Sequence, residues 1–177
     1  QSNNPEKYCE IMADFADYII ESTGAYLVFI PNELYPEKDS SDKYISQKVI
    51  NKMKNSGKTL LIDEEYTAPE LKGIISQFDV AVAARYHTIV ACLSLGIPVL
   101  AIGWHTKYYD VLNIFGLQEY LCEVNLLNNN DLKRIFNRLW DSREELKELI
   151  THKLPGAHKS IYKAGEILVN SIKVKAF

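Results

Sequence analysis

Apolar residues recur along this chain at two different spacings, and the two spacings alternate. Between residues 5 and 22, apolar positions such as Tyr8, Ile11, Phe15 and Ile19 lie three or four residues apart, which is the spacing of one buried helix face. Residues 25–30, AYLVFI, instead form a continuous β-prone run, typical of a buried strand in a parallel sheet. The pattern predicts a helix that ends at Gly24 and a buried strand that follows it.

The same alternation continues to the C-terminal end of the sequence. Further strands are predicted at residues 59–62, 79–83, 98–102 and 121–124. Further helices are predicted at residues 41–55, 68–78, 87–95, 106–115, 131–140 and after Ser142, with Gly57, Gly96 and Gly116 ending three of them. A Ser142–Glu145 capping box is expected to open the last helical region, and Pro155 and Gly156 to interrupt it before a final helix at 158–174.

Strands that alternate with helices in this way are typical of the α/β class. We expect residues 1–177 to form one α/β domain, with a doubly wound, mostly parallel sheet and helices on both faces. Residues 83–112 are the most apolar part, but Gly96 and Pro98 divide them into pieces too short for a bilayer core of about 30 Å. A buried helix, a turn and a buried strand are therefore predicted there, and no transmembrane segment.

Composition narrows the choice of partners. A hydrophobic fraction of 47% is enough for a packed core, and a net charge of -3 argues against nucleic acid, whose phosphates select for concentrated Lys and Arg. The three cysteines, Cys9, Cys92 and Cys122, have no CxxC spacing, so we expect neither a disulfide framework nor a zinc site. A reducing, cytoplasmic location is predicted, and no bound metal.

Cationic residues follow two neighbouring predicted strands. In doubly wound folds, ligands bind outside the carboxyl ends of the strands, and each of these joints also opens a helix whose N–H groups favour anions. Arginine adds a bidentate fork, lysine a point charge, and glycine room for a ligand to approach the backbone. The candidate binding residues are Arg85, His87, Gly103, His105, Thr106 and Lys107.

Structural interpretations of the same residues stay open at this point. Arg85 alone could be a surface ion pair, His87 could cap a helix, and Trp104 could be either a core residue or a lid over a flat ligand. The acidic loop at residues 63–65 is either a solvated charge run or a source of a general base or of sugar contacts. No Walker loop, GxGxxG, GxSxG or HExxH pattern occurs, which removes the usual NTPase, nicotinamide, hydrolase and zinc-protease interpretations.

An ordered set of short motifs resembles the polysaccharide pyruvyl transferase family. The set comprises DVAVAARYH at residues 79–87, LGIP at 95–98 and then Lys107, with PEL at 69–71 before it and FGL at 115–117 after it. Each piece is common but the order is not, and the similarity covers about residues 25–123. Ala84 departs from the pattern, because many members place Gly before the Arg.

The resemblance implies a GT-B-like architecture, of which this chain is the C-terminal, Rossmann-like half, with an N-terminal domain missing from the other wall of the cleft. It implies transfer of the enolpyruvyl unit of phosphoenolpyruvate onto two sugar hydroxyls, giving a pyruvate ketal and phosphate. By the same resemblance, Arg85 and His87 bind the donor, Lys107 is a second cation, and His87 also acts as the acid or helps the phosphate to leave. The implied acceptor is a saccharide or lipid-linked saccharide of a cell-surface or exopolysaccharide, with no cofactor, in the cytoplasm or at the inner face of the membrane.

Two other functions fit the same sequence. A GT-B glycosyltransferase or nucleotide-sugar epimerase would place a diphosphate at this edge and add a carboxylate for the ribose, for which Glu119 and Glu123 are candidates. A non-catalytic module that binds an anion or a carbohydrate would keep the fold without the chemistry.

Overall fold

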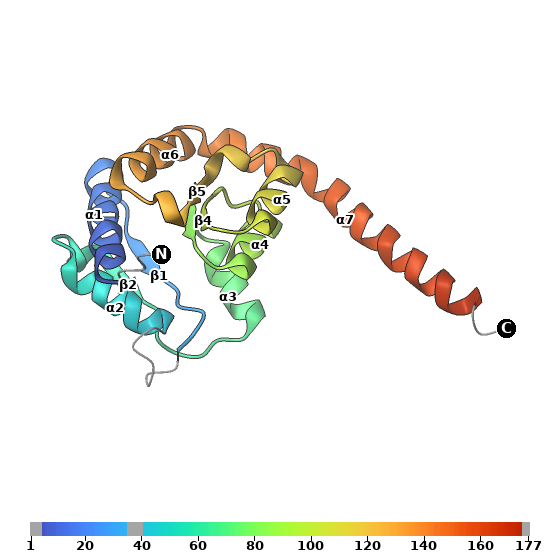
Figure 1. Ribbon diagram of the computed structural model, residues 1–177, viewed down its shortest axis with the longest axis horizontal. Coiled ribbons are helices and arrows are strands. Elements are labelled where there is room, and N and C mark those ends of the chain that lie inside the picture. The colour runs from blue at the N-terminus through green and yellow to red at the C-terminus, as the bar shows by residue number, and fades with distance from the viewer. Residues whose placement is uncertain (1–4, 35–40, 175–177) are drawn as a thin grey trace. The chain divides into compact units, whose positions relative to one another are not determined.

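The computed structural model describes residues 5–34 and 41–174, in which parallel strands alternate with helices (Figure 1). Internal contacts divide the chain into two compact units. The first comprises Gln1–Leu71 and Cys122–Asn137, and the second comprises Lys72–Leu121 and Arg138–Phe177. The helices α3 (Ala68–Ile75) and α6 (Asn129–Asp141) each begin in the first unit and end in the second.

The first unit is built on a two-stranded parallel sheet. Its elements are α1 (Pro5–Thr23), β1 (Leu27–Phe29), α2 (Asp42–Lys52) and β2 (Thr59–Leu61). The register pairs Leu27 with Thr59 and Phe29 with Leu61. The side chain of Ser41 caps α2 by accepting the Tyr44 amide N–H at 3.3 Å, as the preference for Ser at this position predicts.

The core of the first unit lies between α1 and α2. Of the apolar positions that predicted α1, Phe15 and Ile19 are buried, but the α1 residues that form a core with Val49 and Met53 of the α2 segment are Cys9, Ala13, Ala16 and Ile20. Phe15 on α1 also meets Phe136 on α6 edge to face, with ring centroids 5.8 Å apart. Asp17 is buried on the same helix, and its carboxylate accepts the amide N–H groups of Lys54 at 2.9 Å and Asn55 at 2.8 Å.

The second unit holds β3, β4 and the first residue of β5, and the order of these strands is β3-β4-β5. Its elements are β3 (Ala81–Ala83), α4 (Tyr86–Ser94), β4 (Val99–Gly103), α5 (Thr106–Phe115), β5 (Leu121–Glu123) at its boundary, and α7 (Arg143–Val174). Every residue of β4 is buried, which matches its apolar sequence. Gly116 ends α5 in the left-handed conformation, with φ of 72°, where a side chain would be strained.

The predicted α/β class and its parallel strands are confirmed, but one continuous sheet is not, because the ladders of the described residues form two small sheets. The strands β1, β2 and β3 have three residues each, and such short strands hold few ladder bonds with which to extend a sheet. The predicted burial of residues 25–30 is also wrong: β1 is half-buried and Tyr26 is 77% exposed. A two-stranded sheet leaves more of each strand uncovered than the predicted larger sheet would.

Two predicted helix boundaries are wrong for identifiable reasons. The helix predicted at 41–55 ends at Lys52, because the Asp17 carboxylate binds the next amides and Met53 turns to an extended conformation. The break expected at Pro155 does not occur, since α7 runs through it from Arg143 to Val174. Extending an existing helix past one lost hydrogen bond avoids the cost of a new helix nucleus. At the start of α7, the Leu146 amide N–H donates a hydrogen bond to the carbonyl oxygen of Ser142, which directly precedes the helix.

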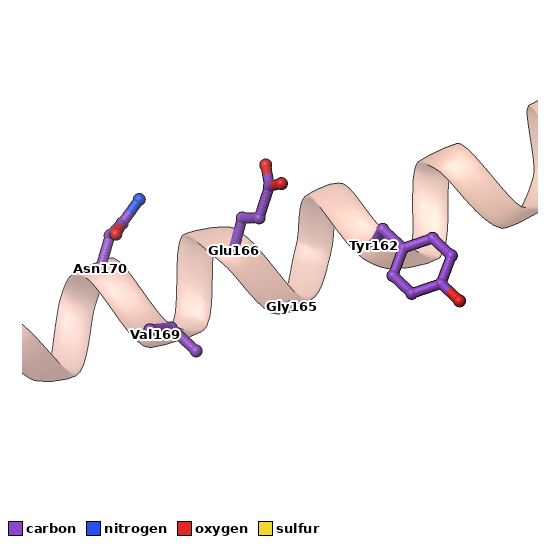
Figure 2. A pocket seen from close by; sticks show the side chains of 5 residues that line it. All are labelled: Tyr162, Gly165, Glu166, Val169 and Asn170. Atoms are coloured by element: carbon purple, nitrogen blue, oxygen red, sulfur yellow. The ribbon is translucent and has the colours of Figure 1, made fainter.

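The second half of α7 is exposed. Tyr162, Ile167, Leu168 and Val169 each expose about half or more of their surface, from 49% to 74%. A shallow groove runs along this part of the helix, where Figure 2 shows Glu166 and Asn170 on one side and Tyr162 and Val169 on the other. All of its lining residues come from α7, so this groove has no second wall in the described residues. Within the described ranges, no helix is both long and apolar enough to cross a membrane.

Candidate anion-binding site

Two strand-to-helix joints of the second unit lie at one edge of its sheet. The strands β3 and β4 are parallel and hydrogen-bonded, and the register pairs Ala81 with Val99 and Ala83 with Ala101. Their carboxyl ends therefore point the same way, and β4 continues two residues further, to Gly103. This is the edge at which doubly wound sheets bind ligands, and it carries all of the predicted site residues.

The first joint places Arg85 at the start of α4. Arg85 is the N-cap residue, with φ of -99° and ψ of 129°, and its carbonyl accepts the Ile89 amide N–H at 3.1 Å. His87 lies in the first turn of the same helix, and both side chains are exposed. The free amides and the dipole of a helix start attract anions, so a guanidinium here adds to a favourable field.

The second joint uses His105 to cap α5. The ring Nδ1 of His105 accepts the Lys107 amide N–H at 3.2 Å and lies 3.3 Å from the Thr106 hydroxyl oxygen. A nitrogen that accepts a backbone N–H carries a lone pair, so the neutral ring holds its proton on Nε2. His105 thus has a structural role as a cap, and its Nε2–H remains a donor for a ligand.

The ammonium of Lys107 lies against two aromatic rings. Its Nζ is 5.1 Å from the centroid of Tyr86, which belongs to the first joint, and 5.5 Å from the centroid of Tyr108. The two rings are themselves edge to face, 6.0 Å apart at 89°. Cation–π attraction at these distances holds the ammonium near both joints.

Tyr108 is the buried residue at the centre of this arrangement. Its side chain is 3% exposed, and its hydroxyl donates to the carbonyl oxygen of Ala84 at 3.2 Å. Its ring also meets Trp104, with centroids 6.0 Å apart. A Cβ on Gly103 would lie 2.6 Å from Cγ of Tyr108, so a side chain there would displace the ring. Gly103 therefore has a packing role that the sequence did not reveal, and its contact with a ligand stays a prediction.

The other candidates from the sequence are placed as follows. Trp104 is 67% exposed, so its interpretation as a core residue is wrong and the lid interpretation remains. The acidic loop at 63–65 is exposed and belongs to the first unit, where Asp63 pairs with Lys43 at 3.3 Å. Glu119 forms an ion pair with Arg138 in the second unit, and Glu123 belongs to the first unit. Both joints belong to the second unit.

Sequence reasoning missed Tyr86 and Tyr108. Each is next in sequence to a predicted site residue, and aromatic residues beside cations are a usable signal for cation–π pairs.

The chemistry of the joints suits a small anion with more than one charged group. In the parts of the chain that the structure describes, no group of three or more His, Cys, Asp or Glu residues is arranged to hold a metal.

The second unit is of the α/β class, with cationic residues at two adjacent strand ends, the edge at which open α/β sheets bind ligands. A sequence profile of the polysaccharide pyruvyl transferase family matches residues 4–106, which is more than half of the 177 residues. The chain belongs to this family of transferases. The match includes Arg85, His87, Gly103, His105 and Thr106, and ends immediately before Lys107. No curated protein and no solved structure matches the chain.

Proposed function

We propose that this chain binds phosphoenolpyruvate and serves as the donor-side domain of a polysaccharide pyruvyl transferase. The observation that carries this proposal is the pairing of two cation-bearing helix starts at one sheet edge, in a chain of this family. Phosphoenolpyruvate has a carboxylate and a phosphate on one small carbon frame. Two adjacent joints supply two places for negative charge, whereas a single helix start would supply one.

In this proposal each group has a distinct role. Arg85 forms a bidentate contact with the carboxylate or phosphate, and Lys107 supplies the second positive charge from its position beside Tyr86 and Tyr108. The proposed contacts of Thr106 and His105 are their hydroxyl and Nε2–H groups. Gly103 is the last, buried residue of β4, and its proposed contact with the ligand is through its backbone.

The proposed reaction converts the methylene of phosphoenolpyruvate to a methyl group. A general acid protonates that carbon, and the positive charge that develops at C2 is attacked by a sugar hydroxyl oxygen. The second sugar hydroxyl then attacks C2 as the bond from C2 to the phosphate oxygen breaks. The two hydroxyl protons balance the new methyl hydrogen and the phosphate that leaves. His87 is our candidate for the acid, because it is exposed in the first turn of α4 beside Arg85.

We further propose that the chain is the C-terminal, Rossmann-like half of a two-domain GT-B-type protein, with residues 1–177 acting as one domain. An N-terminal domain would then supply the other wall of the cleft and select the acceptor. That acceptor would be a saccharide or lipid-linked saccharide of a cell-surface or exopolysaccharide, met in the cytoplasm or at the inner face of the membrane.

The test is calorimetric titration of the chain with phosphoenolpyruvate, uridine diphosphate and inorganic phosphate. We expect phosphoenolpyruvate to bind more tightly than the other two ligands. Arg85→Ala should weaken phosphoenolpyruvate binding about 10- to 100-fold, as expected for the loss of a charge-assisted hydrogen bond. Arg134→Ala is the matched control, since Arg134 is a surface arginine paired with Asp131 at 2.9 Å.

Three results would count against the proposal. A preference for uridine diphosphate would favour a glycosyltransferase or epimerase. Phosphoenolpyruvate binding that Arg85→Ala leaves unchanged would move the site away from this edge. Absence of all binding would show that this chain alone does not form the donor site.

A further inference from the structure

We infer that Tyr108 is a positioning residue that holds the cations of both joints in place for the donor. This inference rests on the proposed function, because it concerns the same site. Tyr108 is part of α5, yet it contacts groups of both joints: its hydroxyl reaches Ala84 beside Arg85, and its ring lies beside Lys107. One buried side chain thus links two strand ends that are far apart in sequence.

The hydroxyl acts on Arg85 through the backbone. The register between β3 and β4 pairs Ala83 with Ala101, and Ala84 follows the last residue of β3. The bond from the Tyr108 hydroxyl to the Ala84 carbonyl oxygen, at 3.2 Å, adds a fixed point beyond the ladder. Because the peptide unit is planar and trans, fixing this carbonyl also fixes the direction of the Arg85 amide. Together with the φ of -99° at Arg85, this sets the direction in which the Arg85 side chain starts.

The ring of Tyr108 acts on Lys107. With Tyr86 it forms two aromatic surfaces, each within 5.5 Å of Nζ measured to the ring centroid. Lysine has several rotatable bonds, and restricting them before a ligand arrives lowers the entropy cost of binding. The ring packs against Trp104 on one side, and Gly103 leaves room for it on another because it has no Cβ. Its position is therefore determined by packing on more than one side.

Every buried tyrosine needs a partner for its hydroxyl, so the bond to Ala84 alone would fit a purely structural role. The two roles predict different effects of a Tyr108 substitution on ligand affinity. A structural role predicts equal effects on all anions. A positioning role predicts a larger effect on phosphoenolpyruvate, whose two anionic groups need both joints in register, than on inorganic phosphate, which has one.

The experiment compares Tyr108→Phe and Tyr108→Leu, with Tyr109→Phe and Tyr109→Leu as matched controls. Tyr109 is the adjacent residue of α5 and is 48% exposed. Tyr108→Phe keeps the ring and removes one hydrogen bond, so it should fold. We expect it to weaken the binding of phosphoenolpyruvate about 3- to 10-fold, and the binding of inorganic phosphate by less. Tyr108→Leu also removes the aromatic contact with Lys107 and should weaken phosphoenolpyruvate binding further.

Amide hydrogen exchange gives a second measurement that needs no ligand. Tyr108→Phe should speed exchange of the Ile89 amide, which bonds the Arg85 carbonyl oxygen, while exchange in β4 stays the same. Gly103→Ala should have the same effect by displacing the ring, and Gly73→Ala is its control, because a Cβ on Gly73 meets nothing within 4 Å.

The results separate this inference from the proposed function. If the wild-type chain does not bind phosphoenolpyruvate, the proposed function fails, and exchange still decides whether Tyr108 holds the first joint. Unchanged exchange in Tyr108→Phe would overturn the inference. If the wild type binds both ligands, two further results would overturn it. One is an equal loss of phosphate and phosphoenolpyruvate affinity in Tyr108→Phe, and the other is no loss of either affinity.

Discussion

Asp17 shows how one side chain can end a helix elsewhere in the chain. Its buried carboxylate accepts two amide N–H groups at 2.9 and 2.8 Å, from the residues that follow α2. Asp17→Ala would leave both amides without this acceptor. We expect it to lower the free energy of unfolding by roughly 3 kcal/mol, since a hydrogen bond to a charged group contributes about 1.5–3 kcal/mol. Urea unfolding followed by circular dichroism measures this loss.

Asp14→Ala is the control for this prediction. Asp14 is an exposed residue of the same helix and makes a side-chain bond to Asn129 at 3.2 Å, so its removal should change stability by less than about 0.5 kcal/mol. Asp17→Asn keeps one acceptor oxygen and should fall between the two alanine variants. Equal stability of Asp17→Ala and Asp14→Ala would show that the two amides find water or other acceptors.

The candidate site shows what single residues reveal in a sequence and what they hide. The cations Arg85 and Lys107 could be placed at one edge, because strand ends in a parallel sheet share an edge whatever the details of packing. The roles of Gly103 and Tyr108 could not, because they depend on a 2.6 Å contact that a Cβ would make in three dimensions. Their spacing in the sequence, five residues, matches no pattern that predicts such a contact.

At the scale of elements, α7 continues through a residue that usually ends a helix. Pro155 lacks an N–H and costs an exposed helix interior roughly 3 kcal/mol relative to Ala. We therefore expect Pro155→Ala to slow amide exchange in α7 on both sides of position 155 and to raise helix content by circular dichroism. The thermal midpoint should rise little, because residues 158–160 and 162–171 are exposed and add little to the core.

Gly156→Ala separates proline chemistry from helix propensity in general. A Cβ on Gly156 meets nothing within 4 Å, so this variant should stabilise α7 by only about 1 kcal/mol. Faster exchange in Pro155→Ala than in the wild type would show that the proline has a favourable contact in this helix.

Helices were predicted better than strands, and the reason is physical. The helix period is carried by many residues, so α5 was placed at residues 106–115, the bounds that the structure gives. The strands have three to five residues and no alternation, so their centres were predicted but not the partners that make two sheets. The end of α2 was predicted too late, because it depends on Asp17, which lies far away in sequence.

At the scale of the whole molecule, the family match covers four of the five strands of the described residues. The matched residues 4–106 contain β1, β2, β3 and β4 and end at the first residue of α5. They include both proposed anion-binding joints except Lys107. The rest of α5, β5, α6 and α7 lie beyond the match.

The stability of the second unit should fall at alkaline pH because of a buried thiol. Burial raises the pKa of Cys92 to about 12 from an ordinary value of 9.0. Below pH 9 the folded and unfolded states both hold this proton. Between pH 9 and 12 the unfolded state releases it while the folded state keeps it, so stability is lost as pH rises, by about 1.4 kcal/mol per pH unit at most.

The measurement is urea unfolding between pH 8 and 10, followed by the emission wavelength of Trp104 and Trp140, which both belong to the second unit. Cys92→Ala should be less stable than the wild type at pH 8, because it leaves a small cavity, and the difference should shrink as pH rises. Some pH dependence should remain in the variant, since burial also raises the pKa of Tyr120, which belongs to the same unit. Parallel curves for the two proteins would show that Cys92 ionises equally in the folded and unfolded states.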